Sequence, residues 1–544
     1  MEKRVILAFV LSFLVLYAFR ALFTPPVPPP GEATQVPANV LSRNPANEQP
    51  SHSDPATELA PEEVRADKAE AVTVETPLYD LTFTNVGGLL KSAKLKKYTD
   101  GGGQPLELIN QDAANKVGWP LGLATGDTAL DEQMATAKFA SLRGPNELVM
   151  EFAHSGIHVR KSFRFDSENY EFTVQTIVRN KGKSIPHTLI WNGIFGDQSI
   201  PQDPARRNAV YQADSTFKRL AVRSLKDQTE NFATLRLGVE DQYFLAMFLF
   251  ADNAVSAKVS KQEYLSADQK SVPTLMVAAS VVEDKPIRVY VGPKQRDWLS
   301  KADPQLASVL DYGYFGFIAK PLVVCLLWIH SYVGNFGWSI ILLTIVINLV
   351  LFPLRLKQQV AMLKMQKIQP QMRRLQDQYK KLKPNDPRRA QVQSEMMGLY
   401  KEHGVNPMGG CLPLLLQMPL LFGFYSALAY SIELRRAPWI LWVKDLSQHD
   451  PYYVIPILMA IAMIVQQKVT PTTSVDPAQA RMMMLMPLMM TFLFLSYASG
   501  LALYWLTGSV VGIGQQIFIN KYWSPRAEAK LKARSKPGEA RGAP

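Results

Sequence analysis

Cysteine is scarce in this chain of 544 residues, which contains only Cys325 and Cys411. The two cysteines lie in different apolar segments, whereas a disulfide framework needs even sets of cysteines at close spacing. A small fold held together by disulfides is therefore excluded. Intrinsic disorder of the whole chain is excluded as well, because nine tryptophans, 25 phenylalanines and 20 tyrosines supply ample apolar surface for cores.

Catalytic motifs are also missing. The run Gly182-Lys183-Ser184 resembles the end of a phosphate-binding loop, but Ile177 occupies the position of the first glycine that such a loop requires. Neither a His-Glu-x-x-His zinc motif nor a Gly-x-Ser-x-Gly nucleophile motif occurs. We therefore expect neither enzymatic activity nor a cofactor or metal site.

The charge balance is 59 lysines and arginines against 47 aspartates and glutamates, a formal net charge of +12. In a soluble protein such an excess suggests binding to nucleic acid. Here much of the excess flanks apolar runs, so we interpret it as topogenic charge and attraction to anionic lipids, and expect no DNA. The mean hydropathy of −0.04 hides a split, because residues 25–310 are mostly polar and residues 316–520 contain long apolar runs.

The first 23 residues indicate a membrane helix. Lys3 and Arg4 precede an apolar run from Val5 to Phe23 that only Ser12 and Arg20 interrupt. A cleaved signal peptide is the alternative, but its apolar region would be about 7–15 residues long and would end at small residues. This run is longer, and prolines follow it. We expect an uncleaved signal-anchor helix at 1–23 with its N-terminus in the cytoplasm.

Two exported segments follow this helix. Residues 24–70 include ten prolines between Pro25 and Pro61, which predicts an extended, disordered tether. Residues 71–300 change to a period of two, with turn residues between the alternating stretches. The clearest of these stretches are Val72–Thr76, Leu78–Thr84, Val159–Phe165, Tyr170–Val178 and Ile287–Val291. They predict a large all-β sandwich domain outside the cytoplasm.

The rest of the chain predicts a bundle of membrane helices. Residues 301–335 are amphipathic, and we expect Lys320-Pro321 and His330 to interrupt the helix, which favours an interfacial segment at the membrane surface over a span. Five spans follow within a core at 336–520, several of them near the short end of the ~17–25 residues that a bilayer requires. They are Trp338–Leu354, Met408–Ile432, Tyr453–Val465, Met482–Tyr497 and Leu501–Ile519. With the first helix, this predicts a polytopic α-helical membrane protein with six transmembrane helices.

Loop charge predicts the orientation of these spans. Twelve lysines and arginines oppose four acidic residues between Arg355 and Asn406, and the tail 521–544 has seven positive and two negative residues. The positive-inside rule places both segments in the cytoplasm, so we expect the chain to be N-in and C-in. Residues 358–406 have a helical period and split at Lys383–Pro387, which predicts an antiparallel helical hairpin. A solvated loop without further function is the alternative.

Polar residues inside the spans are the candidate functional site. Asn348 lies ten residues after Trp338, about 15 Å along a helix and so near the middle of the membrane. Other polar residues within spans are Thr344, Gln417, Tyr504, Thr507, Ser509 and Gln515. Such groups usually face a wet cavity or the bundle interior, although ordinary hydrogen bonding between helices is an alternative explanation. Methionines concentrate at 482–490 and 362–397, which suits either a surface for varied apolar partners or plain packing.

Ten short motifs follow one another in the core. They are Gln358–Met372, Ser394–Tyr400, Val405–Pro419, Glu433–Trp439, Asp445–Ser447, Asp450–Tyr453, Gln467–Thr473, Asp476-Pro477, Met486-Pro487 and Ser499–Tyr504. These motifs resemble the YidC/Oxa/Alb family of membrane protein insertases. The resemblance runs in order from about Ile329 to Gln516, and the anchor, tether and β domain resemble the layout of Gram-negative members. Tyr290–Lys294 resembles the end of the family's β domain.

The resemblance implies a membrane insertase and chaperone of the bacterial inner membrane, with its β domain in the periplasm and no cofactor. Its partners would be nascent membrane proteins, the Sec translocon, the ribosome, targeting factors and anionic lipids. Moving a polar flank through about 30 Å of hydrocarbon is costly. A water-filled groove open to the cytoplasm would shorten that path.

The resemblance also assigns residues to the groove. Thr344, Gln417, Tyr504 and Trp505 match groove positions of the family. The residues that match its apolar slide for the client are Met418, Pro419, Phe492 and Leu493.

One groove position departs from the family. The family usually has a cationic residue, most often Arg, where this chain has Asn348. Arg355 lies seven residues on, beyond Pro353, and could supply the charge nearer the cytoplasm. The sequence therefore leaves two hypotheses open, a polar but uncharged groove and a groove whose charge is displaced.

Three other function classes compete with the insertase. A secondary transporter would need internal repeats around a midplane site, and no repeat relates the two halves of the sequence. An intramembrane enzyme lacks a catalytic constellation. A receptor built around the β domain leaves the polar positions in the spans unexplained, although a β sandwich can bind sugar or peptide or act as a scaffold.

Overall fold

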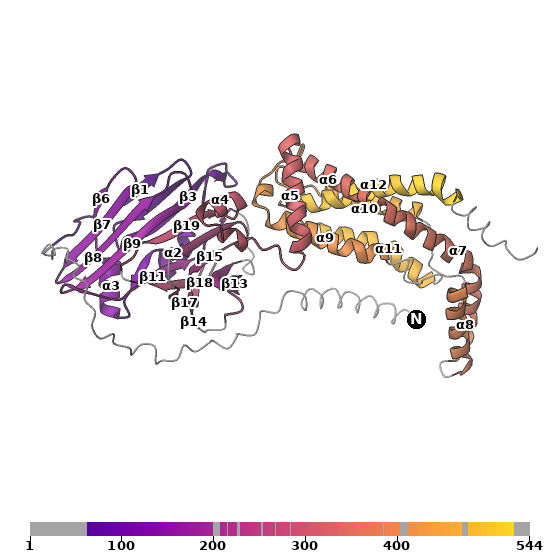
Figure 1. The fold of residues 1–544 in the computed structure, drawn as a ribbon, viewed down its shortest axis with the longest axis horizontal. Helices are drawn as coiled ribbons and strands as arrows, with labels where there is room; N and C mark the ends of the chain where they lie inside the picture. The colour runs from indigo at the N-terminus through magenta and orange to yellow at the C-terminus, as the bar shows by residue number, and fades with distance from the viewer. Residues whose placement is uncertain are drawn as a thin grey trace, which may run out of the picture. The chain divides into compact units, whose positions relative to one another are not determined.

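The structure of the chain is a computed structural model. It describes residues 63–199, 207–214, 216–225, 229–251, 254–266, 268–282, 284–383, 386–402, 412–470 and 477–526. The predicted anchor at 1–23 and most of the predicted tether and tail lie outside the described residues. The chain divides into a β unit and a helical unit, with the boundary between Asp311 and Tyr312 (Figure 1).

The largest sheet of the β unit has ten antiparallel strands. They are β6 (Ala140–Arg143), β7 (Glu147–His154), β8 (Ile157–Phe165), β9 (Glu171–Asn180), β10 (Lys183–Ser184), β12 (Asn208–Ala213), β13 (Thr216–Ala221), β15 (Arg236–Glu240), β16 (Phe244–Leu249) and β19 (Ile287–Pro293). Their order is β13-β12-β15-β16-β19-β9-β8-β7-β6, and β10 pairs with β9.

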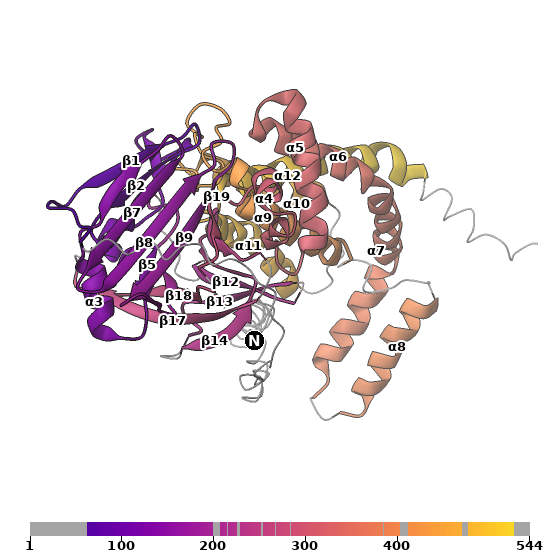
Figure 2. The same ribbon diagram turned by 60° about the vertical axis from the view of Figure 1, so that its left-hand side comes forward.

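Two smaller antiparallel sheets complete the β unit (Figure 2). One contains β1 (Ala71–Glu75), β2 (Tyr79–Thr84), β3 (Leu89–Thr99) and β4 (Pro105–Glu107), paired in that order. The other contains β5 (Gly122–Ala124), β11 (Thr188–Gly193), β14 (Glu230–Thr234), β17 (Val255–Leu265) and β18 (Ser271–Ser280), in the order β14-β17-β18-β11-β5.

Aromatic side chains pack both smaller sheets against the large one. Phe83 of β2 lies 4.6 Å from Phe163 of β8 between ring centroids, and Trp191 of β11 lies 6.2 Å from Phe248 of β16. All four side chains are buried. In β2, β8 and β11 buried and less buried residues alternate around these aromatic positions, as the period of two requires, whereas every residue of β16 is buried.

The predicted β-rich domain is confirmed, and all five alternating stretches named from the sequence form strands. The sequence analysis missed two short helices, α2 (Gln111–Val117) and α3 (Thr128–Thr136), so the domain is not purely β. Both begin at a capping side chain, since Asn110 accepts from the Ala113 N–H and Asp127 accepts from the Ala129 and Leu130 N–H groups.

The boundary of the β unit differs from the expected boundary at residue 300. Helix α4 (Arg296–Ala302) and the 3-10 helix η3 (Leu306–Val309) belong to the β unit, because Leu299, Leu306 and Val309 are fully buried there. Charged groups fasten the same segment. Arg236 Nε donates to Asp303 at 3.1 Å, and Arg219 Nη2 donates to the Val309 carbonyl at 2.5 Å. Residues 301–311 are therefore part of the β unit rather than of the predicted interfacial segment.

Lys161 is a charged group buried inside the β unit. Its Nζ donates to the carbonyl oxygens of Gly87 at 2.7 Å, Gly88 at 3.1 Å and Leu121 at 2.8 Å. These bonds use all three ammonium donors. Burial nevertheless disfavours the charged form and lowers the Lys161 pKa to about 7.

The lowered pKa predicts a pH dependence of β-unit stability. The unfolded lysine keeps a pKa near 10.4, so the unfolded chain binds more protons than the folded chain between about pH 7 and pH 10. Stability from this group therefore rises with pH across that window, by at most about 1.4 kcal/mol per pH unit. Lys161→Met removes this slope and lowers stability, because three carbonyls lose their donor.

The measurement is the urea midpoint for proteolysis of the β unit in the detergent-solubilised full chain, taken between pH 7 and pH 10. The difference between the unsubstituted chain and Lys161→Met should grow as the pH rises. Lys94→Met, at an exposed site on β3, is the matched control and should leave the slope unchanged. A constant difference for Lys161→Met would contradict the prediction.

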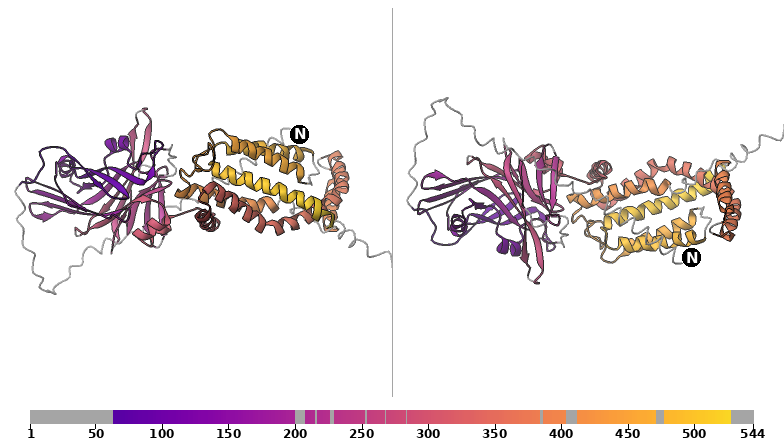
Figure 3. Two further views of the ribbon diagram at one scale, coloured as in Figure 1. Left: turned by 90° about the horizontal axis from the view of Figure 1, so that it is seen from above. Right: turned by 90° about the horizontal axis from the view of Figure 1, so that it is seen from below.

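The helical unit forms an elongated bundle (Figure 3). Its helices are α5 (Gly316–Val333), α6 (Phe336–Val350), α7 (Phe352–Lys381), α8 (Arg388–Glu402), α9 (Leu412–Tyr430), η5 (Ile432–Leu434), α10 (Val454–Val469), α11 (Pro477–Phe494), α12 (Ser499–Phe518) and the π-helix η6 (Ile519–Trp523). Among the described residues, α5 and the continuous helix Ser499–Arg526 are long and apolar enough to cross a membrane. The pair α6–α7 would be a third span if it counts as one bent segment, while α10 and residues Met484–Phe494 are shorter apolar helices.

Helix α5 is continuous, which corrects the expectation that Lys320-Pro321 and His330 interrupt it. Pro321 removes one backbone donor near the start of the helix without ending it. The helix ends at Gly334, whose φ of 69° lies in the left-handed region that glycine adopts without strain. In Figures 1 and 3, α5 lies crosswise to α6, α9 and α12, as a helix at a membrane surface would.

Helices α6 and α7 meet at a bend of 52°. Pro353 causes the break, because it has no N–H to donate and its ring clashes with the carbonyl four residues earlier. Within the first turn of α7 the same residue is tolerated, since donors there have no helical partner. The span predicted at Trp338–Leu354 is therefore two helices.

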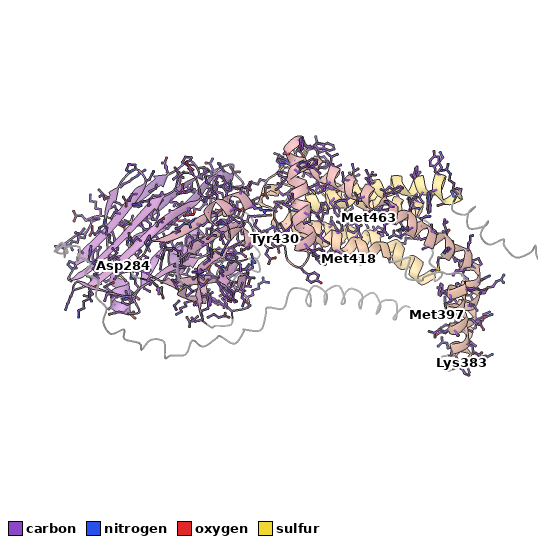
Figure 4. The ribbon with its side chains drawn as sticks, viewed as in Figure 1. Asp284, Lys383, Met397, Met418, Tyr430 and Met463 are labelled. Atoms are coloured by element: carbon purple, nitrogen blue, oxygen red, sulfur yellow. The ribbon has the colours of Figure 1, made fainter. Side chains whose placement is uncertain are left out.

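Helices α7 and α8 form a hairpin whose turn lies next to Lys383, labelled in Figure 4. Ile368 and Met372 are its buried core, and Met365, Met396, Leu399 and Tyr400 pack against them. These methionines therefore have a packing role, while Met397 is exposed on α8. The first helix of the hairpin, α7, begins directly at the bend.

Candidate functional site

The polar residues of α6 lie one turn apart in the bundle interior. Thr344 is fully buried and donates from Oγ1 to the Ile340 carbonyl at 2.6 Å. Asn348 is 7% exposed and donates from Nδ2 to the Thr344 carbonyl at 2.8 Å. The side chains of Thr344 and Asn348 thus both donate to carbonyls of α6 itself. The Asn348 Oδ1 acceptor remains available for a group from another helix.

Arg355 of α7 reaches back to that acceptor. Its Nη2 donates to Asn348 Oδ1 at 2.8 Å, and its Nη1 donates to Gln515 Oε1 of α12 at 2.7 Å. Gln515 closes the ring by donating from Nε2 to the Asn348 carbonyl at 3.0 Å. We call these three residues the Arg355 network. No carboxylate pairs with Arg355 among the residues that the structure describes, so within these residues the positive charge of the network is uncompensated.

One face of α12 runs past the polar groups of the other helices. Tyr504, Gly508, Gly512 and Gln515 recur at spacings of four, four and three residues, which places them on the same side of a helix. A Cβ at Gly512 would lie 2.5 Å from Gln466 Nε2 and 3.3 Å from Arg355 Nη1. Glycine at this position therefore makes room for both polar side chains.

A second polar contact joins α9 to α12. Gln417 Nε2 donates to Tyr504 Oη at 3.0 Å, and the Tyr504 ring stacks on Phe424 with centroids 4.0 Å apart. Trp505 points elsewhere and packs on Phe494 of α11 at 5.4 Å. Of the predicted groove residues, the structure therefore brings Asn348 together with Arg355 and Gln417 together with Tyr504. Thr344 supports Asn348 through its backbone.

The predicted apolar slide is split between two helices. Met418, labelled in Figure 4, and Pro419 are half-buried on α9, whereas Phe492 is 77% exposed and Leu493 is also exposed on α11. Helix α9 approaches the turn that follows α11, where Tyr425 lies 5.7 Å from Tyr497 between ring centroids. Exposed apolar residues continue along α11 at Met484, Leu485 and Leu488.

Sequence reasoning missed the contributions of Gln466 and Gly512. It named Gln515 among the polar residues within spans but did not match it to a groove position. The signal was present in α12, where Gly508 and Gly512 lie four residues apart on one face. Small residues at this spacing permit close helix approach in membranes. Within the described residues, no cluster of three or more His, Cys, Asp or Glu side chains could hold a metal ion.

Comparisons with known proteins identify the family. The family model described as 60Kd inner membrane protein matches residues 328–526, and the YidC periplasmic domain model matches residues 71–325. Membrane protein insertase YidC of Geobacter sulfurreducens is 35% identical over 550 residues, covering 97% of this chain and all of that protein. The same protein of Citrifermentans bemidjiense is 36% identical over 548 residues, covering 96% of this chain and 99% of that protein.

A solved structure titled as an active YidC insertase with its first transmembrane domain resolved is 21% identical, with a TM-score of 0.36. The similarity covers 85% of this chain and 95% of that chain. The identification rests on the two family models, which together span most of the sequence, and on the full-length relatives above 30% identity. This chain belongs to the YidC family of membrane protein insertases and is an inner-membrane protein with a periplasmic β-rich domain.

Proposed function

We propose that this chain inserts newly made hydrophobic segments into the inner membrane through a polar groove whose positive charge is Arg355. The observation that carries this proposal is the 2.8 Å hydrogen bond from Arg355 Nη2 to Asn348 Oδ1. It brings a guanidinium to the position where the family usually has a cationic residue. Of the two hypotheses that the sequence leaves open, this geometry supports the displaced charge.

The chemistry of the guanidinium suits an acidic client flank. Arginine stays protonated in proteins and has five N–H donors, of which the Arg355 network uses two. The remaining donors can bind a carboxylate, in the geometry that arginine and carboxylate groups favour. Because no described carboxylate neutralises Arg355, a client flank would be the first acid to reach it.

Apolar side chains of α9 and α11 suit the client's apolar segment. Met418 and Pro419 on α9 and Phe492 and Leu493 on α11 present apolar surface without a charge among them. A segment that leaves water along these helices gains about 25 cal/mol for each Å² of apolar surface it buries. That gain would drive the step in the absence of nucleotide hydrolysis. The transporter alternative is not favoured, because full-length relatives are named insertases.

We also propose six spans with both termini in the cytoplasm. The bent pair α6–α7 would count as one span, and α9, α10, α11 and α12 as four. The first span would be residues 1–23, outside the described part of the chain. The crosswise position of α5 and its exposed Phe317, Trp328 and Tyr332 support a helix at the periplasmic surface. This orientation places the hairpin α7–α8 in the cytoplasm.

The hairpin is the proposed contact for ribosomes, targeting factors and anionic lipids. Three lysines, Lys380, Lys381 and Lys383, lie at the end of α7 and beside the turn, and the nearby Asp386 pairs with Arg388 at 2.8 Å. Each exposed lysine near an anionic surface contributes about 1 kcal/mol. Proteins of the Sec translocon are proposed partners from the family resemblance alone.

Replacing Lys380, Lys381 and Lys383 by glutamine should weaken co-sedimentation with ribosomes and with anionic vesicles several-fold at low salt. The loss should shrink as salt rises, because screening shortens the reach of surface charges. Deleting 378–389 should have the same effect. Unchanged binding in both variants would remove the hairpin turn from recruitment.

The β unit should be dispensable for insertion if the deletion respects its real boundary. Deleting 71–311 removes every described helix and strand of the β unit, including α4 and η3, and should leave most insertion activity. Deleting only 71–286 leaves β19 without its neighbours β9 and β16 and exposes Leu299, Leu306 and Val309. We expect that second variant to accumulate poorly in the membrane. Loss of activity by the first variant at normal membrane levels would contradict the proposal.

A further inference from the structure

A tight turn between η5 and α10 presents two apolar residues outward. Leu441 is 79% exposed and has a φ of 52°, in the left-handed region that leucine rarely adopts. Ile440 beside it is also exposed. We call Ile440 and Leu441 the apolar tip. Glycine or asparagine would fit such a turn with less strain, so a large apolar side chain at this point needs an explanation beyond the turn itself.

The turn is held rigidly. The Val443 N–H donates to the Ile440 carbonyl at 3.0 Å, and the Trp439 N–H donates to the Val443 carbonyl at 2.9 Å. Asn335, which caps α6, donates from Nδ2 to the Trp439 carbonyl at 3.1 Å. The Trp439 ring packs so closely on α6 that a Cβ at Gly337 would overlap it. The apolar tip is thus presented from a fixed support rather than from a loose loop.

The apolar tip continues an apolar stripe along α6. The stripe consists of exposed side chains at helical spacing, which are Trp338, Leu342, Val346, Leu349 and Val350. Trp338 lies 5.9 Å from Trp439 between ring centroids, so the stripe passes from the helix to the turn without a polar break. An exposed apolar stripe on a helix of an inner-membrane protein faces lipid.

Aromatic residues around the turn are arranged as at a membrane interface. Trp442 donates from Nε1 to Asp450 at 3.0 Å, and the Tyr452 ring packs on it at 6.3 Å. Tyr452 and Tyr453 are exposed. Tryptophan and tyrosine concentrate where hydrocarbon meets headgroups, because they combine an apolar ring with a polar group. The turn therefore has the composition of a segment that dips below the headgroups.

We propose that the apolar tip is embedded among the acyl chains of the leaflet at the α5 end of the bundle. Under the orientation proposed above, this is the periplasmic leaflet. The occupant of the surface is lipid, argued from its continuity with the α6 stripe. Such an anchor would fix the depth of α6, and with it the depth of Asn348, relative to that leaflet.

The test is the depth of a fluorescent probe at Leu441→Cys in the full chain with Cys325→Ala and Cys411→Ala, reconstituted in lipid vesicles. Nitroxide groups on the acyl chains should quench the probe several-fold more strongly than aqueous iodide does. Leu142→Cys is the matched control, because Leu142 on β6 is 73% exposed in the β unit. Its probe should show the reverse preference.

Iodide quenching at Leu441 equal to that at Leu142 would overturn the proposal. Protection from both quenchers would also overturn it and would indicate a protein partner on the turn. A second probe at Ile440→Cys leaves Leu441 in place and so guards against local misfolding at that residue. Adding Leu441→Asn to this variant keeps a residue that fits the left-handed turn but removes the apolar side chain. It should reduce acyl-chain quenching of the probe at position 440 at least twofold. The experiment measures probe depth and involves no client. A negative result would therefore count against the lipid contact of the apolar tip and not against the proposed groove.

Discussion

Arg355→Ala should reduce insertion of a client with an acidic N-terminal flank by about tenfold to a hundredfold. Two unit charges 4 Å apart attract by about 4 kcal/mol at an effective dielectric constant of 20, and solvent in an open groove reduces that value. If about 1.4–2.8 kcal/mol of this attraction remains in the open groove, losing it lowers the rate about tenfold to a hundredfold. The measurement is the rate of client protection from protease in proteoliposomes that contain the purified protein.

Three further variants give this prediction its specificity. Arg355→Lys keeps the charge but loses the fork that contacts both Asn348 and Gln515, so it should retain only part of the activity. Arg355→Ala combined with Asn348→Arg should restore insertion, because it returns a cation to the network. Lys357→Ala, on the exposed side of α7, is the matched control and should have little effect. Equal losses from Lys357→Ala and Arg355→Ala would mean that only general cytoplasmic charge matters.

Asn348→Asp should be nearly as damaging for the same client. Aspartate has the size of asparagine, and its carboxylate would lie at the 2.8 Å contact and neutralise Arg355. Insertion of the acidic-flank client should fall about tenfold or more, while a client with an uncharged flank should insert at nearly the normal rate. The measurement is the ratio of the two rates in one preparation.

Asn348→Leu separates charge from hydrogen bonding. It removes the acceptor that holds Arg355 and costs about 1–3 kcal/mol for a group left without its partner. Both clients should then be affected, because the guanidinium loses its fixed position. A normal rate for both clients in Asn348→Asp and Asn348→Leu would show that Asn348 does not belong to the working site.

The β unit could be predicted from the sequence because its signal is local. Alternating residues such as those of Val159–Phe165 report a half-buried strand directly. The buried Lys161 within the same strand was beyond prediction, because its three carbonyl partners come from turns 40 to 74 residues away. The attachment of α4 and η3 was missed for the same reason, since Arg219 and Arg236 are distant in sequence.

The candidate site was predictable in its residues but not in its connections. A spacing of seven residues suggests that Arg355 and Asn348 share a helix face, but Pro353 between them removes the straight helix on which that inference depends. Long side chains on helices point toward the N-terminus, and here Arg355 reaches back across the 52° bend to α6. Gln515 completes the contact from α12, which no spacing along the chain could reveal.

The most direct test of the displaced charge is the client preference of Arg355→Glu in proteoliposomes. Two clients that differ only in an acidic or a basic N-terminal flank would be inserted in parallel by the unsubstituted chain and by the variant. If Arg355 is the charge that receives the flank, the preference should reverse, with the acidic client falling at least tenfold and the basic client inserting faster than before. An equal fall for both clients, or an unchanged preference, would contradict the assignment of the groove's charge to Arg355.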